Sequence, residues 1–544
     1  MTRLGRFLTL VLLLTQNALA IREITYDVAI YGGTPCGISA AISAAREGAT
    51  VILIEPTDHI GGLSTSGINT AESEHMLKWT IGGFALEFYQ ELGKYYEKHA
   101  AEQDPLPAGD RLNTIYFFES GVAEKTYLKL LDAAQVRVRY GAHLRSVTKD
   151  GTRLRSLILS NESEIKARTF IDASYEGDLM AMAGVSHDIG REARETYDEE
   201  AAGIRFDQKP RRARTVDENG KLLPGISGWA RDFTEGAAHP GVMNYNFRLI
   251  VTSRPADRVP FPAPKHYEAT RYALLANWLR ENPQAKLTDI ISLYKRRNGK
   301  FEMNNSQNAI ISLGHFGGQF DWPAASPAER EKIYQDHLDY TLGLLHFLAS
   351  DEAVPEKLRA ETRSWGLHRE EFADNGHLPY QLYVREGRRM IGAYVVTQHD
   401  VQTERRKEDS IGISSHFIDS HHVQRLALSE NEFINEGRIW RKGYAYQIPY
   451  RSLTPKRAEA SNLLVPGAAS FSHVAYCTLR LESVWMITGQ AAGTAAALAA
   501  ATNTAVQELP LPELQKKLRQ AGQVIDFPAK APEKTDKLNG PPEF

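Results

Sequence analysis

Residues 26–62, YDVAIYGGTPCGISAAISAAREGATVILIEPTDHIGG, decide the fold of this chain. The apolar run Val28–Tyr31 is typical of a buried parallel strand, and Val51–Ile54 is a second such run. Between them, a glycine-rich turn leads into a stretch of alanine, serine and glycine that favours a closely packed helix. The order strand, turn, helix, strand predicts a βαβ unit whose second strand ends at Glu55.

The turn of this unit has the spacing of a dinucleotide-binding fingerprint. In the pattern G-x-G-x-x-G, the glycine positions fall on Gly32, Thr34 and Gly37, so a threonine takes the middle one. Glycines let the backbone approach a pyrophosphate, the helix N-terminus favours its negative charge, and a carboxylate accepts the ribose hydroxyls. Glu55 stands where that carboxylate is expected. The stretch therefore predicts a nucleotide site, with an ordinary tight βα turn as the alternative.

A second segment of small residues lies near the other end of the chain. Residues 462–467 read as an apolar strand, and residues 470–501 end in a helix rich in alanine and glycine. Because Gly489–Ala497 carries almost no side-chain bulk, we expect another backbone or a cofactor to lie against it. A membrane helix is the alternative, but Arg480 and Glu482 make its flank too polar for a span.

Motifs from six parts of the chain carry a resemblance to a known family: VAIYGGTPCGISAAISAAREGATVILIEP with HIGGLSTSG, TFIDASYEGDLMAMAG, YVREGRRMIGAYVVTQHDV, IDSHHVQR, YQIPYRSLTPKRAEASNLLVPG and SHVAYCTLRLESVWMITGQAAGTAAALA. With them the chain resembles the FAD-dependent oxidoreductases of the glutathione-reductase-like flavoprotein class, and most of all a secreted bacterial branch. The resemblance implies FAD as cofactor. It also implies an α/β fold, in which a Rossmann-like FAD-binding domain of glutathione-reductase type carries an inserted α+β substrate domain.

The expected cofactor site combines the glycine turn, the loop after Glu55 and the small-residue helix. Thr34 departs from the glycine usual in the wider class, while Arg480 could add a fixed positive charge beside the flavin. The predicted cofactor-binding residues are Gly32, Gly33, Thr34, Pro35, Cys36, Gly37, Glu55, Gly61, Gly62, Leu63, Ser64, Asp172, Gly467, Arg480, Gly489, Gln490, Ala491 and Ala492.

A flavin carries the electrons itself, so the protein must position the substrate and supply a base. Imidazole is the natural base at neutral pH; His473, just before the small-residue helix, ranks first and His421 second. Arg385 and Arg388 belong to a run of three arginines in five positions, which suits bidentate binding of carboxylate, phosphate or sugar hydroxyls. The alternatives are histidines that only donate and accept structural hydrogen bonds, and arginines in a salt-bridge network.

Histidines and an aspartate in residues 416–422 could also be read as metal ligands. Their spacing does not match a helical His-x-x-x-His pair, and the sequence fixes no third ligand, so we predict no metal site.

A length of 544 residues exceeds one simple core, so we expect two intertwined domains. The predicted limits are a signal peptide at 1–20, the first part of the FAD-binding domain at 21–190, a substrate or cap domain at 191–439, the return segment of the FAD-binding domain at 440–505, and a C-terminal extension with a loose tail at 506–544.

The first 20 residues have the features of a secretory signal: Arg3 and Arg6, an apolar run, and Ala-Leu-Ala at 18–20. We therefore expect an exported protein, periplasmic or extracellular, with no membrane span in the mature chain. A formal net charge of −3 gives no nucleic-acid footprint. The two cysteines, Cys36 and Cys477, are far apart in sequence and predict neither a disulfide nor dithiol chemistry.

These observations favour an exported FAD-dependent oxidoreductase. It transfers a hydride from a small polar substrate, either a carbohydrate or a hydroxy acid, to flavin N5, and an unidentified external acceptor takes the electrons. Two alternatives remain: an FAD-containing non-redox lyase acting on a polysaccharide, and a binding module that has lost its cofactor.

Overall fold

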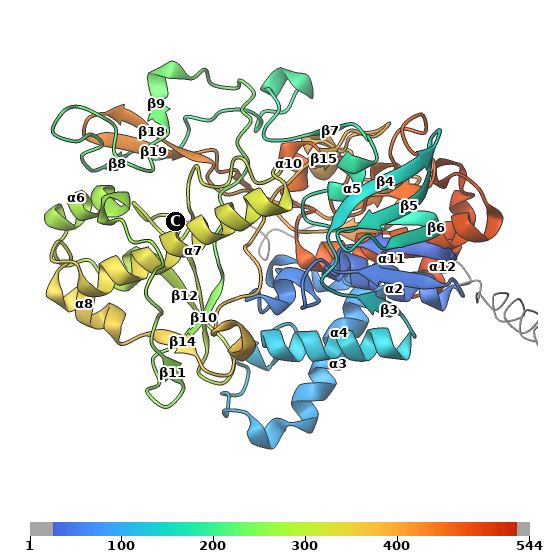
Figure 1. The fold of residues 1–544 in the computed structure, drawn as a ribbon, viewed down its shortest axis with the longest axis horizontal. Coiled ribbons are helices and arrows are strands. Elements are labelled where there is room, and N and C mark those ends of the chain that lie inside the picture. Colours follow the sequence, from blue (N-terminus) through green and yellow to red (C-terminus); the bar gives the residue numbers. More distant parts are fainter. Residues whose placement is uncertain (1–24, 530–544) are drawn as a thin grey trace, which may run out of the picture.

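The computed structural model describes residues 25–529, and the elements fall into two lobes that lie side by side (Figure 1). The predicted signal peptide and the last part of the predicted tail lie outside the described residues. One lobe contains both the start and the end of the described chain, and the middle of the chain forms most of the other.

The first lobe is built on a sheet of order β3-β2-β1-β6-β5-β4, with β22 also paired to β6. Strands β3, β2, β1, β6 and β22 pair in parallel, whereas β5 pairs antiparallel with both β6 and β4. The strands are β1 (Thr25–Tyr31), β2 (Val51–Ile54), β3 (Arg137–Arg139), β4 (Leu144–Asp150), β5 (Arg153–Leu159), β6 (Glu164–Asp172) and β22 (Leu463–Leu464). The parallel strands therefore bring their carboxyl ends to one edge of the sheet.

Two helices of small residues pack against each other beside this sheet: α2 (Pro35–Arg46) and α11 (Glu482–Thr502). A Cβ on Gly489 would lie 2.2 Å from the Cys36 carbonyl oxygen. A Cβ on Gly493 would lie 2.1 Å from that of Ala40. Only glycine fits at these two positions, so the bulk missing from α11 is explained by the backbone of α2.

The return of the chain to the first lobe involves β22 and α11 together. Leu463 and Leu464 pair with Phe170 and Ile171 of β6, more than 290 residues earlier. The other helices of this lobe are α3 (Gly83–Lys98), α4 (Ser120–Ala133), α5 (Asp178–Met182), α10 (His473–Tyr476) and α12 (Leu511–Gln520).

In the second lobe, a five-stranded sheet of order β11-β14-β10-β13-β12 and a four-stranded sheet of order β8-β19-β18-β9 are accompanied by α6, α7 and α8 (Figure 1). Their bounds are β8 (Arg211–Arg212), β9 (Gly228–Trp229), β10 (Leu249–Thr252), β11 (Arg258–Val259), β12 (Ile291–Lys295), β13 (Phe301–Asn305), β14 (Gly366–His368), β18 (Gln424–Ser429), β19 (Glu432–Glu436), α6 (Ala273–Glu281), α7 (Pro327–Ser350) and α8 (Glu356–Arg363).

Three two-stranded ladders and a short helix complete the β-strands and α-helices of residues 25–529. These elements are β7 (His187–Asp188) with β15 (Arg389–Met390), β16 (Ser410–Ser414) with β21 (Tyr446–Pro449), β17 (Ile418–Asp419) with β20 (Trp440–Arg441), and α9 (Gln398–Gln402).

Helix α11 is the one helix of the described chain that is long and apolar enough to cross a membrane. Of its most apolar stretch, 89% is buried inside the molecule.

Candidate active site

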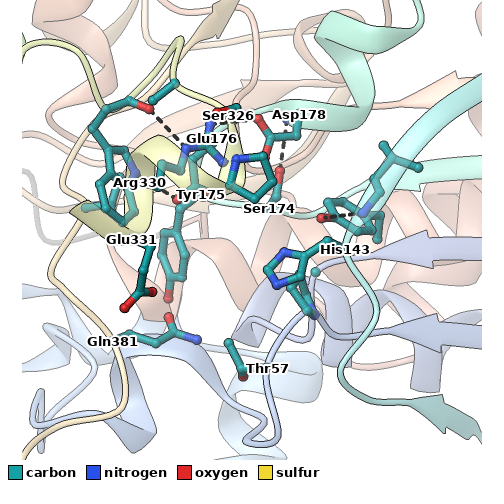
Figure 2. A pocket seen from close by; sticks show the side chains of 18 of the residues that line it. Thr57, His143, Ser174, Tyr175, Glu176, Asp178, Ser326, Arg330, Glu331 and Gln381 are labelled. Carbon is teal, nitrogen blue, oxygen red and sulfur yellow. Dashed lines mark hydrogen bonds and ion pairs between the residues drawn. The ribbon is translucent and has the colours of Figure 1, made fainter. Parts of the chain in front are cut away.

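A cavity of about 1240 Å³ lies at the carboxyl ends of β1, β2 and β6. Gly32 and Thr34 follow β1, Glu55 follows β2 and Ser174 follows β6, and all four line the cavity. Figure 2 shows the opposite wall, which α7 and residues 380–388 supply. Open α/β sheets bind ligands beyond the carboxyl ends of their strands. The volume also exceeds the roughly 300–1,000 Å³ of ordinary small-molecule sites, so an extended dinucleotide fits here.

The threonine in the glycine turn has a structural task. Thr34 is the N-cap of α2: its Oγ1 accepts a hydrogen bond from the Gly37 N–H at 3.3 Å and donates one to the Ala173 carbonyl at 2.8 Å. Gly32 has φ of +104°, and a Cβ there would lie 2.7 Å from the carbonyl carbon of Ala173. The turn is therefore fixed to the end of β6 at two places, which holds the N-terminus of α2 toward the cavity.

Glu55 stabilises the same turn from the other side. Its Oε2 accepts a hydrogen bond from the Gly33 N–H at 2.8 Å, and its Oε1 accepts two from the N–H and hydroxyl of Thr57. Burial raises the pKa of Glu55 to about 7, although these hydrogen bonds act to lower it. A carboxylate can accept about four hydrogen bonds, so one position remains for a ribose hydroxyl.

The far wall of the cavity is crossed by an ion-pair network. Arg330 of α7 donates two hydrogen bonds to the carboxylate of Asp178, from Nη1 at 2.6 Å and from Nη2 at 2.8 Å. Arg388 Nη1 donates to the same carboxylate at 2.8 Å. Burial opposes it, but the two arginines lower the pKa of Asp178. The cap of α5 is Gly177, so Asp178 serves as an anchor between the lobes and not as a helix cap. Arg388 is thus a cavity-wall residue that shares the carboxylate of Asp178 with Arg330.

The loop after Glu55 meets the start of α11 through one tyrosine. The Leu63 N–H donates to the Tyr175 hydroxyl at 2.9 Å, and that hydroxyl donates to Glu482 Oε1 at 3.0 Å. The ring of Tyr175 stacks on Trp485 with centroids 4.8 Å apart. Gly62 lies against the same hydroxyl, since a Cβ there would be 2.3 Å away. The loop therefore reaches the edge of the cavity through Tyr175.

Several predicted cofactor residues lie behind this wall. Asp172 accepts hydrogen bonds from Ser174 and from the Met180 N–H, and it therefore shapes the turn after β6. In α11, Gln490 accepts a hydrogen bond from the Phe84 N–H at 2.8 Å. The predicted residues that the structure places among those lining the cavity are Gly32, Thr34, Glu55 and Arg388; Pro35, Cys36, Gly467, Gly489, Ala491 and Ala492 are buried in the packing around α2 and α11.

The remaining predicted site residues meet at a second place, where residues 383–389, 416–422 and 472–480 come together. We call this group the junction cluster, and it consists of Arg385, Glu386, Arg389, Asp419, His421, His473 and Arg480. All of its members are buried.

His473 is the first residue of α10 and is held by a carboxylate. Its Nδ1 lies 2.8 Å from Glu386 Oε1, while its Nε2 is buried with no hydrogen-bond partner among the described residues. Although burial works against it, His473 and Arg389 lower the pKa of Glu386, so this carboxylate is ionised. An ionised Glu386 favours the tautomer with the proton on Nδ1, which leaves the lone pair of Nε2 free.

His421 lies beside a neutral amide and near arginines, whereas His473 lies beside a carboxylate. The Nδ1 of His421 lies 2.7 Å from the side-chain nitrogen of Gln307, an amide that can donate but not ionise. Burial and then Arg385 and Arg480 lower the pKa of His421 well below its ordinary value. Proton uptake by His421 is therefore opposed by burial and by its cationic neighbours.

Arg480 is paired within the junction cluster. Its Nη2 lies 3.0 Å from Asp419 Oδ2, and its Nη1 donates to the Tyr383 hydroxyl at 2.8 Å. Glu482, two residues further along the chain, accepts a hydrogen bond from Tyr175 instead.

Some residues of the cavity and of the junction cluster were not predicted from the sequence. Arg330 lies in the first turns of an ordinary helix sequence, SPAER, and Tyr175 follows β6 in a motif noted only for its neighbours. Glu386 lies within the arginine run, but its contact with His473 is not readable from the chain. Within residues 25–529, no group of three His, Cys, Asp or Glu side chains is placed to hold a metal ion. Both cysteines are free and buried.

These features define an α/β protein with a Rossmann-like dinucleotide site. The model of the family described as FAD dependent oxidoreductase matches residues 27–518, so the chain belongs to this family of flavoenzymes and FAD is its cofactor. A search of curated proteins gives no match.

Solved structures show limited similarity. THI4 from Thermovibrio ammonificans is 18% identical with a TM-score of 0.22, over 35% of this chain and 75% of that one. OxyS anhydrotetracycline hydroxylase from Streptomyces rimosus is 15% identical with a TM-score of 0.23, over 34% and 41%. A geranylgeranyl bacteriochlorophyll reductase-like protein from Thermoplasma acidophilum is 12% identical with a TM-score of 0.34, over 92% and 84%.

Proposed function

We propose that this flavoenzyme oxidises a hydroxyl group of a small polar substrate, a carbohydrate or a hydroxy acid, with His473 as the base. The observation that carries the proposal is the Nε2 of His473, which has no hydrogen-bond partner within residues 25–529, while the other ring nitrogen is held 2.8 Å from Glu386. A base oriented by a third group is the usual arrangement for removing a proton from a weakly acidic hydroxyl.

The proton and the electrons take separate routes in this reaction. The substrate O–H and C–H bonds both break, and the alcohol carbon becomes a carbonyl. FAD supplies a two-electron acceptor that takes the hydride at N5. His473 takes the hydroxyl proton at Nε2, and the ionised Glu386 stabilises the imidazolium that forms. His421 is the second candidate for the base, opposed by its cationic surroundings.

The finer fold assignment belongs to the same proposal. We assign the first lobe to the glutathione-reductase type of FAD-binding domain and residues 191–439 to a substrate domain inserted into it. The support is the discontinuous first lobe, whose parallel sheet joins β22 to β6 and whose α11 packs on α2. The substrate domain supplies the second wall of the cavity.

Export to the periplasm or the extracellular space is also part of the proposal. Its support is the sequence pattern of residues 1–20, which lie outside the described residues. Cell fractionation of the full-length chain, with N-terminal sequencing of the mature protein, tests it; a retained N-terminus in the cytoplasmic fraction contradicts it.

The experiment for the activity is a flavin spectrum followed by an anaerobic screen. The purified protein should show flavin absorbance bands, and sugars and hydroxy acids should be screened for bleaching of these bands without oxygen. Bleaching together with a carbonyl product supports the proposal. Substrate turnover without bleaching identifies the lyase alternative, and a colourless protein that cannot be reconstituted with FAD identifies the binding module.

A further inference from the structure

Three arginines in one short segment have different ionic partners. Arg388 lies 2.8 Å from Asp178, and Arg389 lies 2.6 Å from Glu192. Arg385 is 1% exposed and forms no ion pair with any described residue. One of the three buried charges is therefore left without a counter-ion.

The contacts of Arg385 are all with neutral groups. Its guanidinium donates to the Asn244 carbonyl and to the side-chain oxygens of Asn246 and Asn305, the last at 3.1 Å. It also stacks over the ring of Tyr383 at 4.3 Å. Its Nε is buried with no hydrogen-bond partner among the described residues. Neutral acceptors orient a guanidinium, but they do not offset the cost of burying its charge.

The neighbouring charges increase this imbalance. Burial and the nearby guanidiniums of Arg480 and Arg248 lower the pKa of Arg385 to about 9. The acids of the region have other partners: Asp419 pairs with Arg480 at 3.0 Å, and Arg248 pairs with Glu302 at 2.5 Å and with Glu72 at 3.5 Å. The place around Arg385 therefore attracts an anion that the described chain does not supply.

The surroundings of Arg385 indicate the chemical class of that anion. The next residue is Glu386, which holds the proposed base His473. The side chains of Asn246 and Asn305 contact the guanidinium, and such neutral amides also suit the hydroxyl groups of a ligand. The flat guanidinium, with a free Nε–H, matches the geometry of a carboxylate.

We propose that the substrate is a carboxylate anion, a sugar acid or a hydroxy acid, and that its carboxylate pairs with Arg385 while its hydroxyl faces His473. This inference rests on the proposed function, because it places the substrate at the same base. It separates acids from neutral sugars as the substrate class.

The test compares ligands that differ only in charge, using the holoenzyme. Glucuronate against glucose, and lactate against 1,2-propanediol, are titrated anaerobically while the flavin absorbance is recorded. Spectral shifts report binding and bleaching reports reduction. At least one acid should bind about 10- to 100-fold more tightly than its neutral partner, because a charge-assisted hydrogen bond contributes that much.

Two variants and a matched control assign the effect to Arg385. Arg385→Gln should lose the advantage of the acid, and Arg385→Lys should recover part of it, since a charge without the planar fork remains. Arg297→Gln is the control: Arg297 is also buried, stacks on Tyr96 at 4.2 Å and donates to backbone carbonyls, but lies outside the junction cluster. It should keep the acid preference. Circular dichroism checks that each variant folds, and absorbance measures its FAD content separately.

Several results would overturn the inference. Neutral ligands that bind as well as the acids, a sugar phosphate that binds more tightly than the sugar acid, or an unchanged acid preference in Arg385→Gln each contradict it. So does loss of FAD from Arg385→Gln and Arg385→Lys alone, which would assign this arginine to the cofactor. Reduction by neutral sugars only would leave the proposed function standing, whereas binding of acids without any reduction would remove the proposed function and keep the anion site.

Discussion

The contact between α2 and α11 and the junction cluster hold this molecule together by opposite means. In the first, Gly489 and Gly493 let two backbones approach so closely that no added atom fits. In the second, long charged side chains are buried and stabilised by one another, as with Arg389 between Glu192 and Glu386. The helix contact is therefore sensitive to added volume, and the cluster is sensitive to the loss of a partner. The four predictions below test this difference, starting with the largest expected effect.

Replacing the base should produce the largest change. We expect His473→Gln to slow anaerobic flavin reduction by about 10²- to 10⁴-fold, because glutamine cannot take up a proton. His421→Gln should cost less, since Glu386 supports His473 alone. Stopped-flow absorbance measures both rates at equal FAD content. A larger loss in His421→Gln would reverse the assignment of the base.

Adding one carbon between the helices should destabilise the fold. We expect Gly493→Ala to lower the free energy of unfolding by about 1–3 kcal/mol, because its Cβ would lie 2.1 Å from the Ala40 oxygen. Gly121→Ala in α4 is the matched control, since no atom lies within 4 Å of that Cβ. Urea denaturation compares the two variants, and equal stability would show that the helix contact tolerates volume.

A buried carboxyl at the start of α11 should make stability depend on pH. Burial raises the pKa of Glu482 to about 8, above its value in an unfolded chain. Between about pH 5 and pH 8 the native state keeps a proton that the unfolded state has lost. Stability should therefore fall as the pH rises, by at most about 1.4 kcal/mol per unit, and level off above pH 8.

Glu482→Gln removes this titration and keeps the acceptor for Tyr175. Urea unfolding at pH 5, 6, 7 and 8 should show the wild-type protein losing stability relative to the variant. A constant difference across this range would mean that Glu482 is ionised throughout.

The smallest expected effect concerns the threonine of the glycine turn. Thr34→Ala should cost about 1 kcal/mol of unfolding free energy, because the Gly37 N–H loses its cap. Thr34→Gly should lower the free energy of unfolding by only about a few tenths of a kcal/mol, because glycine is a tolerated N-cap. Chemical denaturation of both variants decides this, and equal losses would assign the effect to the hydrogen bond with Ala173 instead.

The local parts of the fold were readable from residue patterns. The glycine turn, its helix and the two flanking runs predict the βαβ unit, which the structure contains as β1, α2 and β2. The bulk-free helix at 482–502 was expected to face a backbone or a cofactor, and the backbone is that of α2. Short-range spacing carries this information because glycine and alanine act through their own small volume.

The ionic partners could not be read in the same way. The arginine run at 385–389 predicted either ligand binding or salt bridges, without saying which residue does which. The structure pairs Arg388 with Asp178, 210 residues earlier, and leaves Arg385 unpaired among the described residues. No local pattern marks such a partner, since any carboxylate brought close by the fold can serve.

By itself, the sequence determined the nucleotide-binding unit, the small-residue helix and the candidate residues of the site, because these depend on steric size and on spacing along the chain. The tertiary structure alone decided that His473 lies 2.8 Å from Glu386 while His421 lies among cations. The two imidazoles are chemically identical in the sequence. Their different surroundings come from charged groups that only folding brings near them.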